Sequence, residues 1–347
     1  MPTEGLRTSP SRPCTPEVDG AVTAVAQPNI ALIKYWGKRD ERLVIPWTSS
    51  LSMTLDVFPT TTTVRLAPAA GADRVTLNGR HAAGETLRRV LDFLELVREL
   101  AGRRERAVVD SHNTAPTGAG VASSASGFAA LAVAAAAAYD LDLDATELSR
   151  LARRGSGSAS RSVFAGFSLW HAGGEEDPDG SSYAEPVPVR GLDPALVIAL
   201  VDDSPKAVSS RAAMRRTVDT SPLYRPWADS SERDLIEMRL ALGRGDLDAV
   251  GEIAERNALG MHATMLAARP AVRYLSPGTL TLLDRVLRLR QEGTPAYSTM
   301  DAGPNVKVLC HSSDADRVAA ALRDAIPSGS VVVARSGPGA RLLSGGS

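Results

Sequence analysis

The chain has 347 residues, a mass of 36.5 kDa and a formal net charge of −1, so its length allows two domains or one large α/β unit. The near-zero charge argues against a general polyanion binder, and an aromatic content of 4% argues against a surface that stacks nucleic-acid bases. Two distant cysteines form no metal-spaced pair, and no apolar run approaches the roughly 18 residues of a membrane helix. The composition favours a cytoplasmic protein without nucleic-acid or membrane partners.

The first half of the chain mixes strands with helices. Residues 1–20 are rich in Pro, Thr and Ser and lack an apolar segment, which predicts a disordered extension. A loop is expected through Lys34–Lys38. β-Branched and alternating residues predict strands over 22–26, 60–66, 74–77 and 107–110. Apolar residues at helical spacing or Ala-rich runs predict helices over 86–100, 123–139 and 146–154, the last beginning at Thr146.

The second half begins after a Gly-, Asp- and Ser-rich segment, 173–182, which predicts an exposed loop. Strands are expected over 196–201, 306–310 and 330–334, and helices over 229–242, 247–268, 279–292 and 314–325. A Gly- and Ser-rich tail, 336–347, is predicted to be flexible. Strands and helices without strict alternation indicate an α+β fold with a boundary near residue 190, hence domains over 21–190 and 191–335.

Lysine is rare, since only four of the 39 basic residues are lysine. A coding bias toward Arg would leave Lys where a compact ammonium, not a planar guanidinium, is required. All four lie in or beside polar motifs, at Lys34, Lys38, Lys206 and Lys307. Chance survival is the alternative explanation.

The segment Pro116–Gly127 is a loop of small residues between a strand and an Ala-rich helix. Such a loop allows backbone N–H groups to approach phosphate oxygens, and the helix N-terminus favours negative charge. Ser123 and Ser124 would supply hydroxyls to a phosphate or its magnesium ion. The loop lacks the Gly-Lys-Ser/Thr of a Walker sequence and the dinucleotide fingerprint. A tight turn onto a packed helix is the alternative.

Three further segments carry candidate chemistry. Gly155–Arg161 and Ser209–Arg211 combine small residues with an Arg suited to a phosphate or carboxylate, although a linker and a solvated helix face are alternatives. Asp301 lies on a Gly-Pro turn, where an ionised carboxylate could accept a hydroxyl proton or merely shape the turn. No His lies beside a nucleophile in sequence, so a Ser–His–Asp triad has no support.

Together these segments resemble the diphosphomevalonate decarboxylases of the GHMP kinase superfamily. The matching segments are Asn29–Lys38, Pro46–Thr54, Pro116–Gly127, Gly155–Phe164, Val208–Met214 and Met300–Asn305. Ordinary kinases of the superfamily carry a Gly-Glu-His type segment where this chain has Tyr35-Trp-Gly-Lys38, which favours the decarboxylase branch.

The resemblance implies a ribosomal-S5-like N-terminal domain, a ferredoxin-like C-terminal domain and a homodimer. It also implies ATP- and Mg²⁺-dependent decarboxylation of mevalonate 5-diphosphate to isopentenyl diphosphate, in the mevalonate pathway of isoprenoid biosynthesis. A phosphomevalonate decarboxylase or a mevalonate 3-kinase would share nearly all of these residues. A plain small-molecule kinase and a non-enzymatic binding protein are less compatible with the motifs.

The resemblance also assigns roles to matching positions. Asp301 would orient or deprotonate the 3-hydroxyl, with Lys38 near enough to favour its charged form, and Arg161 would hold the substrate carboxylate. The implied substrate-binding residues are Tyr35, Lys38, Ser156, Ser158, Arg161, Ser210 and Arg211. The implied ATP-binding residues are Pro116, Gly118, Ala119, Gly120, Ser123 and Ser124, with Ser124 at the metal.

Overall fold

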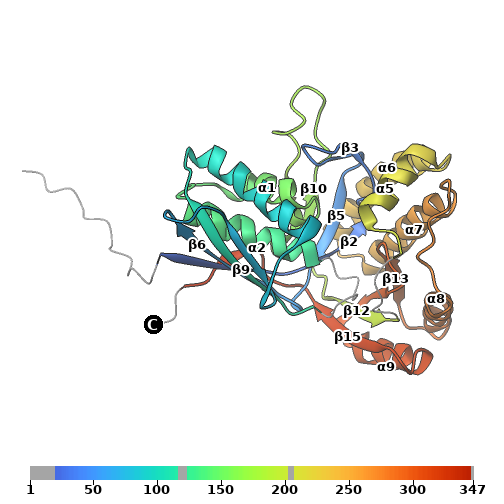
Figure 1. The fold of residues 1–347 in the computed structure, drawn as a ribbon. Helices are drawn as coiled ribbons and strands as arrows, with labels where there is room; N and C mark the ends of the chain where they lie inside the picture. Colours follow the sequence, from blue (N-terminus) through green and yellow to red (C-terminus); the bar gives the residue numbers. More distant parts are fainter. Residues whose placement is uncertain (1–19, 116–122, 202–206, 345–347) are drawn as a thin grey trace, which may run out of the picture.

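The computed structural model describes residues 20–115, 123–201 and 207–344 (Figure 1). The predicted disordered extension therefore lies outside the described residues, apart from Gly20. Strands and helices are mixed throughout, as the α+β prediction required. Three larger sheets and one short hairpin organise the described chain. No helix in the described ranges is both long enough and apolar enough to cross a membrane.

A six-stranded sheet dominates the first half of the chain, in the order β16-β1-β6-β9-β7-β8. Its strands are β1 (Ala21–Ala26), β6 (Thr60–Ala67), β7 (Arg74–Leu77), β8 (Arg80–His81), β9 (Arg106–Asn113) and β16 (Arg341–Leu342). The helices that share its core are α1 (Gly84–Ala101), α2 (Ser123–Ala138) and α3 (Ala145–Gly155). The alanines of α2 are almost all buried, and their small side chains allow that helix to pack closely on β1 and β6.

A second sheet has the order β11-β10-β5-β2, beside a separate β3-β4 hairpin. Its strands are β2 (Asn29–Ile33), β5 (Ser50–Thr54), β10 (Phe167–Trp170) and β11 (Ala184–Pro186), and the hairpin joins β3 (Lys38–Asp40) to β4 (Ile45–Pro46). The sequence analysis predicted none of these strands. Every residue of β2, β5 and β10 is buried, so none of the three shows the contrast between a core face and a solvent face that identifies a half-exposed strand.

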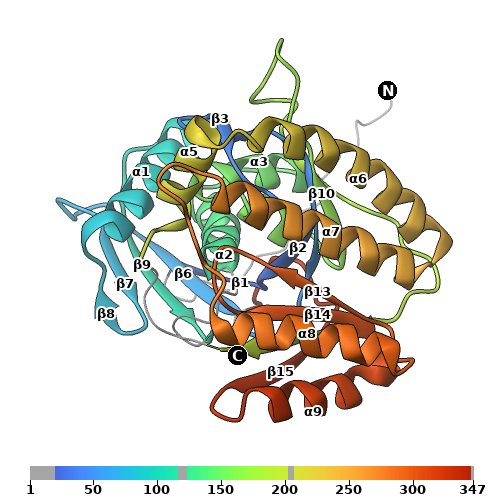
Figure 2. The same cartoon turned by 90° about the vertical axis from the view of Figure 1, so that its right-hand side faces the viewer.

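The third sheet has the order β13-β14-β12-β15. It contains β12 (Pro194–Leu200), β13 (Ala296–Met300), β14 (Val306–His311) and β15 (Ser330–Arg335). The remaining helices are α4 (Ala159–Ser162), α5 (Ser210–Thr220), α6 (Tyr224–Arg244), α7 (Leu247–Leu266), α8 (Pro277–Gln291) and α9 (Ala315–Ala325). Helices α8 and α9 pack on this sheet, whereas α7 contacts both β2 and β13 (Figure 2). One hydrophobic core therefore joins the second sheet, α6, α7 and β12.

Two details differ from the sequence prediction. Helix α3 is capped by Asp144, not Thr146, because the Asp144 side chain accepts from the Glu147 N–H and the Glu147 carboxylate accepts from the Asp144 N–H. The tail predicted to be flexible from Ser336 is wrong for its described part. Ser336 bridges Leu55, the Gly337 N–H bonds the Thr54 carbonyl, and β16 pairs with β1.

Candidate active site

A cavity of about 1270 Å³ brings together side chains from both halves of the chain. Helices α1, α2 and α5, the β2–β3 segment, the α3–α4 connection and the residue after β13 all contribute to its lining. The cavity gathers every described candidate residue, namely Tyr35, Lys38, Ser123, Ser124, Ser156, Ser158, Arg161, Ser210, Arg211 and Asp301. The other candidates, Pro116, Gly118, Ala119, Gly120 and Lys206, lie outside the described residues.

Asp301 is the only carboxylate among these candidates, and two buried lysines hold it. Oδ1 lies 2.9 Å from Lys34 Nζ, and Oδ2 lies 3.1 Å from Lys307 Nζ. Burial alone would raise the pKa of Asp301, but the two ammonium groups outweigh it and hold that pKa well below its usual range. The carboxylate is 29% exposed, on the cavity side. It is therefore an ionised group that a ligand can reach.

Lys38, which the resemblance placed near Asp301, is not one of the two lysines paired with that carboxylate. Lys38 lies on the β3–β4 hairpin, and its ammonium pairs with Glu41 at 2.6 Å. Lys34 follows directly after buried β2, and its backbone N–H is fixed by the side chain of Asn257 on α7. This anchoring directs Lys34, not Lys38, to Asp301.

Arg161 is buried, 2% exposed, in a polar cradle made by two strands. Its Nη1 donates to Ser50 Oγ at 2.5 Å, its Nε donates to Ser52 Oγ at 2.9 Å, and Asn29 Oδ1 accepts from the guanidinium at 3.3 Å. Because side chains alternate along a strand, Ser50 and Ser52 of β5 share one face while Leu51 enters the core on the other. Burial lowers the pKa of Arg161 to about 10, so the guanidinium is charged at neutral pH.

The N-terminus of α2 faces the same cavity through Ser123 and Ser124. Ser124 Oγ lies 3.2 Å from Ser156 Oγ, which joins the start of α2 to the end of α3. Among the described residues, no cluster of three or more His, Cys, Asp or Glu side chains is placed to hold a metal ion. The hydroxyls of Ser123 and Ser124 fit Mg²⁺ carried on nucleotide phosphates, since Mg²⁺ keeps several waters and takes few protein oxygens.

Two candidates for the substrate diphosphate have different surroundings. The hydroxyl of Tyr35 is buried and has no hydrogen-bond partner among the residues that the structure describes, and burial raises its pKa. Arg211 Nη1 instead pairs with Glu85 Oε1 of α1 at 2.9 Å. Both members of that pair are largely exposed, so a bound anion could replace Glu85 at small cost.

The structure adds site residues that the candidate set omitted, namely Asn29, Ser50, Ser52, Lys34 and Lys307. The scarcity of lysine was a usable signal for Lys34 and Lys307, since Lys34 lies within a matching segment and Lys307 follows another. Ser50 and Ser52 lie within a matching segment, but their role depends on the pairing of β5 with β10, which the sequence pattern did not reveal.

A buried histidine next to this cluster leads to a pH prediction. His262 is 2% exposed, and burial together with the ammonium of Lys34 lowers its pKa to about 4. Below an ordinary His pKa of about 6.5, the unfolded chain therefore binds a proton that the folded chain does not. Stability should fall between about pH 6.5 and 4, by about 1.4 kcal/mol per pH unit, or about 2 kcal/mol at pH 5.

Urea unfolding at pH 7 and pH 5 would measure this loss, and His262→Gln should remove most of it. His81→Gln, on the exposed strand β8, is the matched control and should keep the pH dependence of the parent. Parallel pH dependences for the parent and His262→Gln would contradict the assignment.

The mixed sheets, the helix N-terminus at the cavity and the ionised carboxylate in the same cavity agree with the GHMP-kinase type of α+β protein that the resemblance implied. The family models agree: residues 26–184 match the diphosphomevalonate decarboxylase-like N-terminal domain, and residues 196–337 match the mevalonate 5-diphosphate decarboxylase C-terminal domain. The chain belongs to the diphosphomevalonate decarboxylase family, which confirms the resemblance found in the sequence.

Relatives and solved structures are similar over most of their length. The diphosphomevalonate decarboxylase of Ganoderma lucidum is 38% identical over 82% of this chain and 77% of its own, and that of Homo sapiens is 36% identical over 89% and 82%. The mevalonate diphosphate decarboxylase structure from Enterococcus faecalis has a TM-score of 0.87 and 44% identity, covering 93% of this chain and 99% of that one. A further structure, MDDEF in complex with MVAPP, AMPPCP and magnesium, has a TM-score of 0.88 and 45% identity over the same shares.

Proposed function

We propose that this cavity carries out the ATP-dependent decarboxylation of mevalonate 5-diphosphate, with Asp301 acting on the 3-hydroxyl. The products are isopentenyl diphosphate, ADP, phosphate and carbon dioxide. The observation that carries the proposal is the Asp301 carboxylate, kept ionised by Lys34 and Lys307 in the same cavity as Arg161 and the start of α2. The family membership and the ligands of the related complex support the choice of substrate.

The substrate itself explains why ATP is needed. A 3-hydroxy acid has no carbonyl that could take up the electrons of the breaking C–C bond, so its hydroxyl must first become a leaving group. ATP with Mg²⁺ supplies the phosphoryl group for this purpose. Departure of the 3-phosphate and loss of carbon dioxide then leave the double bond of isopentenyl diphosphate.

Different residues of the cavity would serve different parts of this reaction. Asp301 would orient the 3-hydroxyl or accept its proton, which an ionised carboxylate can do at neutral pH. Arg161, fixed by its cradle, would hold the carboxylate until it leaves as carbon dioxide. The remaining polar wall would bind the diphosphate through Tyr35, Lys38, Ser156, Ser158, Ser210 and Arg211. The start of α2, with Ser123 and Ser124, would bind the ATP phosphates, Ser124 nearest the metal.

The domain division, the oligomeric state and the location belong to the same proposal. The matches of the two family models, 26–184 and 196–337, support a boundary near residue 190. The core that joins the second sheet to α6, α7 and β12 crosses that boundary, so the two domains would unfold together. We propose a cytoplasmic homodimer, a state that sedimentation of the purified protein would test.

We predict that the protein prefers the diphosphate over the monophosphate about a hundredfold in kcat/KM. This ratio corresponds to about 3 kcal/mol in activation free energy. Lys38, Arg161, Lys206 and Arg211 supply more positive charge than one carboxylate and one phosphate need. Purified protein is incubated with ATP, Mg²⁺ and mevalonate carrying no, one or two phosphates, while carbon dioxide and ADP are measured. Equal turnover of the monophosphate would favour a phosphomevalonate decarboxylase, and ADP release without carbon dioxide would indicate a 3-kinase.

A further inference from the structure

The indole of Trp170 lies directly behind the substrate-binding side of the cavity. Trp170 is the last residue of β10 and is fully buried. The ring of Tyr35 meets it edge-on at a centroid distance of 4.7 Å, and the guanidinium carbon of Arg161 lies 5.8 Å from its ring centroid. A β-carbon built on Gly157 would lie 2.6 Å from Cη2 of Trp170, so the backbone there rests on the ring. One indole therefore supports three parts of the cavity wall.

A single hydroxyl fixes the orientation of this indole. Trp170 Nε1 donates to Ser182 Oγ at 3.1 Å, and Ser182 Oγ donates to the carbonyl of His171 at 2.9 Å. A serine hydroxyl has one hydrogen and two lone pairs, so these two bonds use it as donor and acceptor at once. Ser182 is fully buried, and its loss would leave the indole N–H without a partner in a water-poor environment.

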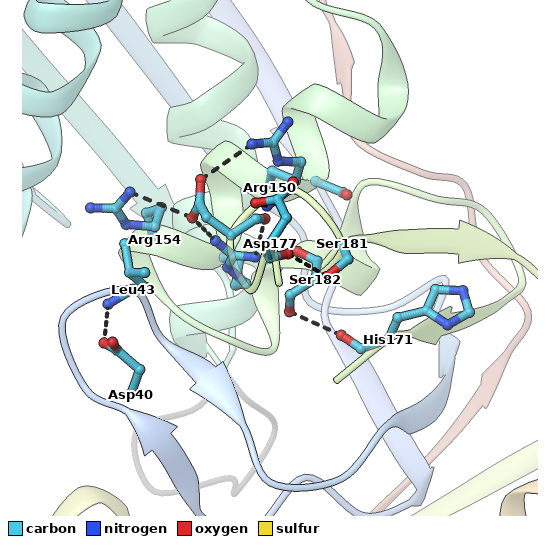
Figure 3. A network of polar contacts seen from close by, with 12 residues as sticks. Asp40, Leu43, Arg150, Arg154, His171, Asp177, Ser181 and Ser182 are labelled. Carbon is cyan, nitrogen blue, oxygen red and sulfur yellow. Dashed lines mark hydrogen bonds and ion pairs between the residues drawn. The ribbon is translucent and has the colours of Figure 1, made fainter. Parts of the chain in front are cut away.

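The sequence analysis predicted residues 173–182 to be an exposed loop. The last residue of this loop, Ser182, is held in place by contacts with helix α3. Fully buried Arg153 of α3 pairs with Asp179 and donates to the carbonyl of Ser182. Arg150 and Arg154, both labelled in Figure 3, also form ion pairs with Asp179, at 3.2 and 3.8 Å. The chain of contacts runs from α3 through this loop to Ser182, to Trp170 and then to the cavity wall.

We propose that Trp170, oriented by Ser182, is a positioning residue that sets Tyr35, Gly157 and Arg161 for the bound substrate. This inference rests on the proposed function, because it concerns the substrate side of the same cavity. It assigns no chemical step to Trp170, whose indole acts through the residues that face the substrate. The contacts of the ring described above do not include the nucleotide side of the cavity, at the start of α2. The affinity for ATP should therefore be nearly independent of Trp170.

The first test is Ser182→Ala in the full chain, with steady-state kinetics for both substrates. The KM for mevalonate 5-diphosphate should rise about tenfold, because an unpaired buried donor destabilises the aligned ring, while the KM for ATP should stay within about twofold. Ser181→Ala is the matched control. Its hydroxyl bonds Gly174 N–H and the Asp177 carbonyl in the same loop, so both KM values should stay within about twofold of the parent (Figure 3).

A double-mutant cycle with Trp170→Phe separates positioning from general loosening of the loop. Phe keeps an aromatic ring but removes the N–H, so Ser182→Ala should have an effect of less than about twofold in that background. In protein labelled with ¹⁵N-tryptophan, the indole resonance that Trp170→Phe removes should shift in Ser182→Ala and stay in place in Ser181→Ala. This resonance is measured without substrate and does not depend on turnover.

Three results would overturn the inference: equal effects of Ser182→Ala in both backgrounds, equal changes in the two KM values, or an indole resonance that Ser182→Ala leaves unmoved. A parent protein that does not turn over mevalonate 5-diphosphate overturns the proposed function instead, and the indole resonance still tests the link between Ser182 and Trp170.

Discussion

Replacing Asp301 with Asn is expected to lower the rate of phosphoryl transfer by about 10²–10⁴-fold. Asn has nearly the same size but carries no charge and cannot accept the hydroxyl proton. The turn after β13 should survive, because its hydrogen bond uses the backbone carbonyl of Asp301, which accepts from the N–H of Gly303 at 2.8 Å. A role limited to shaping this turn therefore predicts an active Asn variant, and the two explanations differ by orders of magnitude.

The same substitution removes the negative charge shared by Lys34 and Lys307. Burial already lowers the pKa of Lys34, and the loss of its counter-ion should lower that pKa further. The variant should consequently be less stable, yet still able to bind the anionic substrate. ADP release and substrate affinity are the quantities to measure, with the folded fraction determined on the same samples.

Asp73→Asn is the matched control for this loss of stability. Asp73 is a carboxylate with 4% exposure, paired with Arg98 at 3.1 Å, and neither residue lines the cavity. The control should reduce stability without lowering turnover per folded molecule. Turnover of Asp301→Asn within about tenfold of the parent would show that this carboxylate serves the structure alone.

Arg161→Lys is expected to lower activity about a hundredfold or more, since an ammonium cannot reproduce the planar fork of a guanidinium. The cradle bonds three different nitrogens of Arg161, through Ser50, Ser52 and Asn29. Lys has one nitrogen to place among these partners and would leave at least one buried polar group unpaired. Both the orientation of the charge and the local packing should change.

Steady-state kinetics and circular dichroism of the Lys variant would measure these effects. Arg98→Lys provides the comparison, because Arg98 is also a buried arginine, bonded to Asp73 and Glu95 away from the cavity. We expect Arg98→Lys to reduce stability and leave kcat within about twofold. Near-parental rates in Arg161→Lys would assign Arg161 to the fold and not to the carboxylate.

The sequence predicted most helices, several strands with one exposed face such as β6, and the buried apolar strands β12 and β14. The helix of residues 86–100 was found as α1 because its apolar residues recur at helical spacing while the others remain exposed. Strands β2 and β5 gave no such contrast, since both faces of each are covered. The prediction of a flexible C-terminal tail also failed for its described part. Gly337 and Gly339 indicated flexibility, but their lack of side chains permits close packing against Leu55 and Val163.

The candidate site followed from motifs, whereas the contacts within it did not. Asp301 and Arg161 could be nominated because their segments match a family pattern. The partners of Asp301 depended on the relative direction of side chains from β2 and β14, which the sequence does not specify. The resemblance suggested Lys38, but the anchoring of Lys34 by Asn257 on α7 is a contact between distant segments.

The pairing of β16 with β1 also bears on the biosynthesis of the protein. Ala24 lies opposite Leu342 in the finished sheet, so the outer edge of β1 stays unpaired until residues 341–342 have been translated. At about 5–20 residues per second, that interval is on the order of tens of seconds. During it, the backbone N–H and C=O groups along that edge are open to other nascent chains on the same messenger. The sheet is therefore completed only when β16 has left the ribosome, not when the first domain emerges.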